Sequence, residues 1–206
     1  MTDLLGGAGN RDVRDTLRVL RQLAGPAFTL DRVLDVGCGD GESTLGLAQG
    51  ARAVVGVEES PAELEAARAR ATKSAATNVE FFPLRAGLEG VAGRFDVVHS
   101  FAAFERIPIS VGFPLIEATL DCIAVRGGGM LHFVYGNASI SQAARRSSSK
   151  LMHRLMRTHE PALATHEYDV NRVLAILHAR RFDRVALRFT DIEQHPGVKM
   201  FFWRGY

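Results

Sequence analysis

Cysteine is scarce in this chain, and long apolar runs are absent. The 206 residues contain only Cys38 and Cys122, so no disulfide framework of the kind found in small secreted domains is expected. Nowhere do about 18 apolar residues follow one another, and residues 1–7 lack the basic start and apolar stretch of a secretory signal. We therefore expect no membrane span and a cytoplasmic location.

The chain also lacks an excess of charge of either sign. The 25 Lys and Arg residues and 23 Asp and Glu residues leave a formal net charge of +2, so no long-range field favours nucleic acid or an anionic membrane as a partner. No cluster of His, Asp and Glu has tight ligand spacing, so we expect no metal site. The chain is 47% hydrophobic and has no internal repeat, which predicts one domain with a full core over residues 1–206.

The most informative segment is residues 33–43, VLDVGCGDGES, in which an apolar strand ends in a glycine-rich turn that opens a helix. Glycine adopts backbone angles that a Cβ forbids and lets the main chain approach a ligand, while the helix start offers unpaired N–H groups to an anion. Asp35 interrupts the strand, whereas a dinucleotide-binding strand is normally apolar up to its G-x-G-x-x-G turn. The candidate ligand-binding residues of the turn are Gly37, Cys38, Gly39 and Gly41.

A second strand, residues 53–57, ends at Glu58, which lies 21 positions after Gly37. A carboxylate about 20 residues beyond such glycines commonly binds ribose hydroxyls. Glu59 follows it and borders the site, with its side chain expected to point away from the ribose. The spacing predicts a cofactor that contains adenosine.

Strand and helix patterns alternate along the chain, as a parallel sheet with crossover helices requires. Helices are expected over residues 12–23, from a Ser60 cap to about residue 72, and over residues 170–179. The expected strands are residues 33–36, 53–57, 79–82, 95–101 and 129–134, followed by a hairpin of 184–189 and 198–203.

The D-x-G-x-G-x-G core that begins at Asp35 resembles the first motif of class I S-adenosylmethionine-dependent methyltransferases. FDVV at 95–98 and RGGGML at 126–131 are similar to the signatures of that family's fourth and fifth strands. The resemblance extends over residues 30–203. It implies an α/β, Rossmann-like fold whose seven-stranded, mostly parallel sheet has an antiparallel C-terminal hairpin strand and helices on both faces. It also implies S-adenosyl-L-methionine as cofactor and S-adenosyl-L-homocysteine as product.

The same resemblance assigns the cofactor contacts. Asp35 and the glycine turn are expected to hold the methionine portion and Glu58 the ribose, while apolar groups near Phe101 or Phe104 line the methyl channel. Many relatives carry an acid after the third strand, where this chain has Arg85. Because arginine cannot accept a hydrogen bond from adenine, backbone near Ala86 or the shifted acid Glu89 is expected to read that base. The complete candidate set is Asp35, Gly37, Cys38, Gly39, Gly41, Glu58, Glu59, Arg85, Ala86, Ser100, Phe101 and Phe104.

The acceptor side is less well specified. Residues 100–108 contain no Asn-Pro-Pro-Tyr, which disfavours methylation of an amide or exocyclic base nitrogen. We expect O-methylation of a small-molecule or sugar-containing acceptor, with Tyr135, His166 or His195 as the catalytic residue. His99 and His132 lie within strands and are expected to be core residues with one satisfied nitrogen.

Two features of the acceptor side leave alternatives open. Arg106 stands where many relatives have histidine. It either binds an acid or phosphate, or it caps a helix or pairs with Glu105. The basic residues Arg145, Arg146, Lys150, Arg154 and Arg157 fall in an expected helix, for which a solvated amphipathic face is favoured over a phosphate-binding lid. The single domain then divides into an N-terminal helix (1–29), a cofactor-binding core (30–135), an acceptor-side insertion (136–169), and a last helix with the closing hairpin (170–206).

Two other functions remain open from the sequence. An NAD-dependent oxidoreductase would also use a glycine turn and a ribose-binding acid, although Asp35 and the turn spacing disfavour it. A non-catalytic module that only binds S-adenosylmethionine has the same residues, because catalysis by positioning leaves no separate signature.

Overall fold

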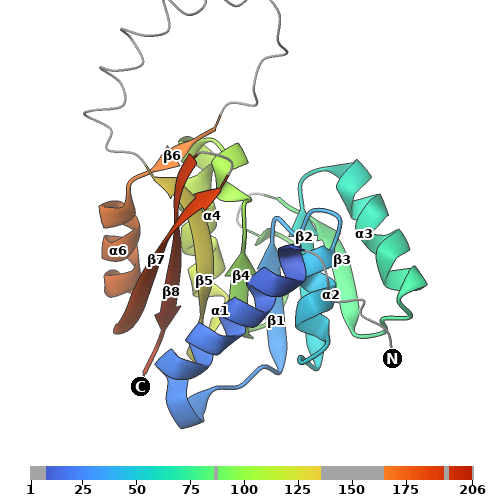
Figure 1. Cartoon of the computed structure of the whole chain (residues 1–206), viewed down its shortest axis with the longest axis horizontal. Coiled ribbons are helices and arrows are strands. Elements are labelled where there is room, and N and C mark those ends of the chain that lie inside the picture. The colour runs from blue at the N-terminus through green and yellow to red at the C-terminus, as the bar shows by residue number, and fades with distance from the viewer. Residues whose placement is uncertain (1–7, 86–87, 136–164, 193–194, 206) are drawn as a thin grey trace, which may run out of the picture.

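The computed structural model describes residues 8–85, 88–135, 165–192 and 195–205 (Figure 1). Their strands form one sheet in the order β3-β2-β1-β4-β5-β8-β7, with β6 paired to β5 outside that path. The strands are β1 (Arg32–Val36), β2 (Ala53–Glu58), β3 (Val79–Pro83), β4 (Phe95–Ser100), β5 (Ile123–Tyr135), β6 (Glu167–Tyr168), β7 (Arg184–Ile192) and β8 (His195–Trp203). Strands β1 to β5 are parallel, and β8 is antiparallel to both β5 and β7. This arrangement confirms the predicted fold class.

Helices cover both faces of the sheet. They are α1 (Ala8–Ala24), α2 (Glu42–Ala48), α3 (Pro61–Lys73), α4 (Ile109–Asp121) and α6 (Val170–Ala179), with short 3-10 turns η1 (Gly25–Ala27) and η3 (Phe104–Arg106). One core cluster packs α1 and α2 against the sheet, and the other packs α4 and α6 against the opposite face. Among the described residues, no helix is both long and apolar enough to cross a bilayer.

The helix starts follow local sequence signals. Ser60 caps α3 by accepting a hydrogen bond from the backbone N–H of Glu63 at 3.3 Å, and Pro61 occupies the first helical position. Asp169 caps α6 in the same manner through the N–H of Asn171 at 2.9 Å. These caps set α3 and α6 where the sequence predicts them.

Several elements differ from the expected boundaries. Strand β5 begins at Ile123 rather than residue 129, because its glycines lie against neighbouring backbone, where a Cβ on Gly128 would come 2.1 Å from the Phe202 carbonyl oxygen. The two-residue strand β6 was not predicted, since so short a segment shows no periodicity. Strand β8 begins at His195, which pairs with Ile192, so His195 belongs to a strand and does not lie in the hairpin loop between the expected strands 184–189 and 198–203. The basic helix expected around Arg145 lies outside the described residues.

Tyr168 of β6 connects the sheet to the segment that follows β4. Its side chain is fully buried, contacts the rings of Phe104, Phe113 and Phe133, and donates a hydrogen bond of 2.8 Å to the carbonyl of Ile107. Burial raises the pKa of this hydroxyl, so it stays a donor at ordinary pH. Tyr168 therefore fixes the backbone at Ile107.

We expect Tyr168→Phe to lower the free energy of unfolding by about 1 kcal/mol, because one buried hydrogen bond is lost while the ring packing is kept. Gly112→Ala is the companion variant, since its Cβ would lie 1.8 Å from the same hydroxyl and would overpack the site by about 1–3 kcal/mol. Urea denaturation followed by circular dichroism measures both. Unfolding free energies equal to that of the wild type would contradict this role of Tyr168.

Candidate functional site

The glycine turn is bound to the end of β2. The N–H groups of Gly37 and Cys38 donate to the carbonyl of Val57 at 2.8 and 3.0 Å, and the N–H of Gly41 donates to the Cys38 carbonyl at 3.0 Å. Gly37, Gly39 and Gly41 all have positive φ. The turn is therefore held open at the carboxyl edge of the sheet, where ligands bind in open α/β folds.

Glu58 ends β2 beside this turn. Its Oε2 accepts a hydrogen bond from the N–H of Gly39 at 3.0 Å, and its Oε1 accepts one from the N–H of Ser60 at 3.0 Å. The residue is only 6% exposed, yet it lines a cavity. Each carboxylate oxygen keeps a further acceptor site, so Glu58 can bind two hydroxyls without releasing the turn.

Two adjoining cavities lie over the carboxyl ends of the strands. The first, of about 240 Å³, is lined by Gly37, Glu58, Glu59, Ser60, Leu84, Ala103, Arg106 and Ile107. The second, of about 310 Å³, is lined by Glu59, Leu84, Arg85, Ile107, Ser110, Val111, Pro114 and Leu115. Three residues line both, so the cavities form one groove with a polar end at Glu58 and an apolar end at α4.

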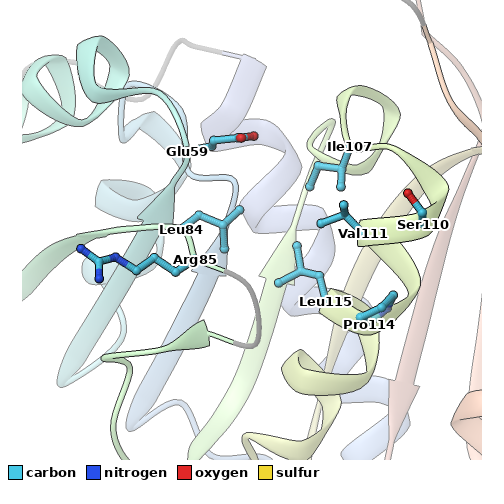
Figure 2. A pocket seen from close by; sticks show the side chains of 8 residues that line it. All are labelled: Glu59, Leu84, Arg85, Ile107, Ser110, Val111, Pro114 and Leu115. Atoms are coloured by element: carbon cyan, nitrogen blue, oxygen red, sulfur yellow. The ribbon is translucent and has the colours of Figure 1, made fainter.

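The apolar end is a slot between β3 and α4. Figure 2 shows Leu84 on one side facing Ile107, Val111 and Leu115 on the other. A flat, uncharged ring fits between such aliphatic side chains, which exclude water from its faces. The groove thus combines a carboxylate that keeps acceptor sites with an apolar slot.

Comparison with known proteins agrees with this geometry. Residues 29–126, just under half of the chain, match a family model described as a methyltransferase domain. The magnesium protoporphyrin IX methyltransferase of Synechocystis with bound S-adenosylhomocysteine superposes with a TM-score of 0.69 at 18% identity, over 95% of this chain and 83% of that one. The YcgJ protein of Bacillus subtilis gives a TM-score of 0.66 at 13% identity, over 94% of this chain and 99% of that one. Residues 29–126 thus match a methyltransferase domain, and the chain has the fold of the methyltransferase with bound S-adenosylhomocysteine named above.

Curated relatives match over shorter stretches. The 23S rRNA (uracil(1939)-C(5))-methyltransferase RlmD of Klebsiella pneumoniae is 52% identical over 121 residues, which is 59% of this chain and 26% of that protein. The corresponding protein of Burkholderia thailandensis is 34% identical over 139 residues, which is 62% of this chain and 29% of that protein. The methyltransferase domain therefore spans less than a third of the length of these relatives.

Asp35 of the methyltransferase domain faces the core rather than the groove. Its Oδ1 lies 2.7 Å from His99 Nδ1, and its Oδ2 accepts a hydrogen bond of 2.7 Å from the Thr44 hydroxyl. The residue is 1% exposed. Both carboxylate oxygens are thus engaged by protein groups, so Asp35 of β1 is linked to Thr44 of α2 and to His99 of β4.

His99 continues this network to the N-terminal helix. Its Nε2 lies 3.2 Å from Oδ2 of Asp12 in α1, and the other oxygen of Asp12 accepts from Lys199 of β8. Burial alone would lower the pKa of His99, but the two carboxylates outweigh it and raise the pKa to about 9. His99 is therefore an imidazolium with two bonded nitrogens, whereas the sequence predicted a core histidine with one.

His132 behaves differently although it lies in the same face of the sheet. Burial and the charge of Lys199 lower its pKa to about 4, so it is neutral. Its Nε2 lies 3.2 Å from the Thr190 hydroxyl, while Nδ1 has no hydrogen-bond partner among the described atoms. This matches the expectation of a core histidine with one satisfied nitrogen.

The residues expected near the methyl channel lie around β4. Ser100 donates from its buried hydroxyl to the Val36 carbonyl at 2.8 Å. Phe101 packs its ring 5.1 Å from that of His132, and Phe104 is fully buried against Phe133. None of the three is among the residues that line the two cavities. Their role in cofactor binding stays a prediction.

Arg85 follows β3 and lines the apolar end of the groove. Figure 2 shows the Arg85 side chain directed away from the slot, while Glu59 projects into the groove. Ala86 lies outside the described residues, and Glu89 is exposed. Reading of the base by backbone near Ala86 stays a prediction.

The candidate catalytic residues come from the acceptor end. Tyr135 ends β5 and packs its ring 5.5 Å from that of Phe189. The N–H of His166 donates to the carbonyl of Glu105 at 2.8 Å, which places its backbone beside η3. His195 begins β8, antiparallel to β5, so its backbone lies at the same edge of the sheet. All three positions thus belong to the carboxyl edge, and their catalytic role stays a prediction.

Cys38 is not a nucleophile in this environment. Burial and the nearby carboxylates of Asp35 and Glu58 raise the pKa of its thiol, so it remains protonated at ordinary pH. Over the described part of the chain, no three His, Cys, Asp or Glu side chains are grouped to hold a metal ion.

The wall that α4 contributes to the groove was not predicted from the sequence. Ala103, Val111 and Leu115 line the groove, although none carries a polar or charged group that would draw attention in a sequence. A signal was present in Ile107-Pro108, because proline at the N-cap of α4 fixes where that helix begins. Val111, 49% exposed, is an apolar residue at the surface that marks this wall.

Proposed function

We propose that the methyltransferase domain transfers the methyl group of S-adenosylmethionine to an oxygen atom of a small-molecule or sugar-containing acceptor. The observation that carries the cofactor assignment is Glu58, a carboxylate fixed by two backbone N–H groups at the mouth of a cavity. When bound, S-adenosylmethionine supplies a methyl group already activated by a positively charged sulfur.

The residues present fit this cofactor. A Cβ placed on Gly39 would meet nothing within 4 Å, so the turn faces open space that a ligand can enter. Glu58 offers free acceptor sites to the two ribose hydroxyls. Leu84 and Ile107 begin the apolar slot that suits the adenine ring.

The protein's contribution is then mainly alignment. Gly37 and Gly39 let the backbone approach the methionine portion, and Glu58 fixes the ribose, so the donor carbon is held in one place. Orienting donor and acceptor in line can contribute about 7–11 kcal/mol to catalysis. A base among Tyr135, His166 and His195 would take the proton of the acceptor hydroxyl.

Sequence features favour a small-molecule or sugar-containing acceptor. The absence of Asn-Pro-Pro-Tyr in residues 100–108 and the near-balanced charge favour a hydroxyl of a small or glycan-type molecule over a base in nucleic acid. RNA is the second candidate, because the curated relatives named above act on 23S rRNA. The Synechocystis neighbour is a magnesium protoporphyrin IX methyltransferase, and a porphyrin is a small molecule.

Calorimetric titration of S-adenosylmethionine, S-adenosylhomocysteine and NAD tests the cofactor assignment. We expect the wild type to bind the first two and not NAD. Glu58→Ala should weaken S-adenosylhomocysteine about 10- to 100-fold, because hydrogen bonds to a charged group contribute about 1.5–3 kcal/mol. Glu59→Ala is the matched control, since Glu59 lines the same cavity without a hydrogen bond to the turn, and its effect should be smaller.

A folded wild-type protein that binds no S-adenosylmethionine would sink the assignment, and retention of NAD would favour the oxidoreductase. The acceptor is tested by transfer of a labelled methyl group to phenols, hydroxy acids, sugars and 23S rRNA. Incorporation into RNA alone would overturn the small-molecule proposal. Tight cofactor binding with no transfer to any acceptor would instead indicate a non-catalytic binding module.

A further inference from the structure

Arg106 is a cation that lines the groove and has no ion-pair partner among the described residues. It ends η3, is exposed, and lines the smaller cavity together with Gly37 and Glu58. No ion pair or side-chain hydrogen bond joins its guanidinium to another residue in the ranges that the structure describes. Pairing with Glu105, one of the alternatives for this arginine, is therefore not observed there.

The charges around Arg106 make this position informative. The carboxylate of Glu58 accepts hydrogen bonds from the N–H groups of Gly39 and Ser60, and Glu59 also lines the cavity, yet neither carboxylate forms an ion pair with Arg106. A donor with a positive sulfur would bring a second positive charge into the same cavity. Two like charges repel in a partly enclosed site, so the arrangement is favourable when an anion lies between them.

Arginine is suited to that anion by its shape. Its planar fork matches a carboxylate or phosphate through two parallel hydrogen bonds, and it never loses its charge to act as a base. The N–H of His166 donates to the carbonyl of Glu105, so the backbone of a candidate base lies next to the residue before Arg106. An acceptor that carries an acidic group beside its hydroxyl could then place the acidic group at Arg106 and the hydroxyl near the segment of His166.

We propose that the acceptor of this methyltransferase domain is an acid, carrying a carboxylate or phosphate close to the methylated oxygen, and that Arg106 binds that anionic group. The inference rests on the proposed function and specifies its substrate class. It makes Arg106 a specificity-determining residue.

The test uses two acid and neutral pairs, salicylate with salicylamide and phenyl phosphate with phenol. Their binding to the whole 206-residue chain saturated with S-adenosylhomocysteine is measured by ligand-observed NMR. In the wild type we expect at least one acid to bind about tenfold more tightly than its neutral counterpart. Arg106→Gln should reduce that preference to about threefold or less, and Arg106→Lys should retain part of it because the charge remains.

The affinity for S-adenosylhomocysteine itself separates the explanations. It should be unchanged in Arg106→Gln, and a tenfold loss would instead assign Arg106 to the carboxylate of the cofactor and overturn the proposal. Equal binding of acids and neutral counterparts, no binding of either acid, or an acid preference that survives in Arg106→Gln would overturn it as well. Because cofactor titration is independent of the probes, failure of the proposed function appears as lost S-adenosylhomocysteine binding by the wild type.

Discussion

Asp12→Ala should lower the free energy of unfolding by about 3–5 kcal/mol, because removal of one partner leaves buried charges uncompensated. Asp12 is 6% exposed and contacts both His99 and Lys199. With Asp35 the four side chains carry two charges of each sign, and each carboxylate oxygen has a partner. Burial would raise the pKa of Asp12, but His99 and Lys199 lower it, so its charge is stabilised in the folded state.

Urea denaturation at neutral pH measures this loss. Asp15→Ala is the matched control in the same helix, because Asp15 is half exposed and pairs with exposed Arg18 at 3.0 Å. Exposed pairs of this kind contribute about 0–1 kcal/mol. Equal losses in the two variants would contradict the buried network.

The pH dependence gives the network a second signature. Since His99 has a folded pKa of about 9 against an ordinary value of 6.5, its contribution is fully present below about pH 6.5 and is lost as the pH rises through 9. The groups that face it are Asp12 and Asp35, with Lys199 bonded to Asp12. The wild type should therefore lose stability between pH 6.5 and 9, whereas His99→Gln should be nearly flat over that window. An identical slope in His99→Gln would exclude His99 as the titrating group.

Local patterns account for what the sequence predicts well. The glycine turn and Glu58 follow from residues that are adjacent or separated by one crossover helix, and Ser60 carries its own capping signal. The sheet follows from alternation of strands and helices, because each parallel strand needs a crossover. Such features require no knowledge of distant contacts.

Distant contacts account for what the sequence does not predict. His99 contacts Asp12, which is 87 positions away in the sequence, and Asp35, which is 64 positions away. The residues near His99 in the chain therefore do not indicate that two carboxylates flank its ring. The α4 wall of the groove is apolar and reads as ordinary core. The side-chain direction of Arg85 depends on how β3 ends, which a residue pattern does not specify.

Gly39→Ala should abolish most cofactor binding while costing little stability. Gly39 has φ of +53°, and a Cβ there would meet nothing within 4 Å, so the variant carries only the strain of about 1–2 kcal/mol for a left-handed residue. The added methyl group would occupy the space above the turn into which the methionine portion is proposed to fit. We expect the Kd for S-adenosylhomocysteine, measured by calorimetry, to rise about 100-fold, equivalent to about 3 kcal/mol.

Two other glycines make this result interpretable. Gly25, in η1, has φ of +61° and equally open surroundings but precedes the amino end of β1, whereas the groove lies at the carboxyl end, so Gly25→Ala should show the same strain with unchanged affinity. Gly37→Ala should instead unfold the site, because its Cβ would lie 2.2 Å from that of Ala103. If Gly39→Ala and Gly25→Ala bind S-adenosylhomocysteine equally well, the turn does not approach the cofactor. A loss confined to Gly39→Ala and Gly37→Ala, with stability lost mainly in Gly37→Ala, would separate the ligand-facing glycine from the one that packs against the segment after β4.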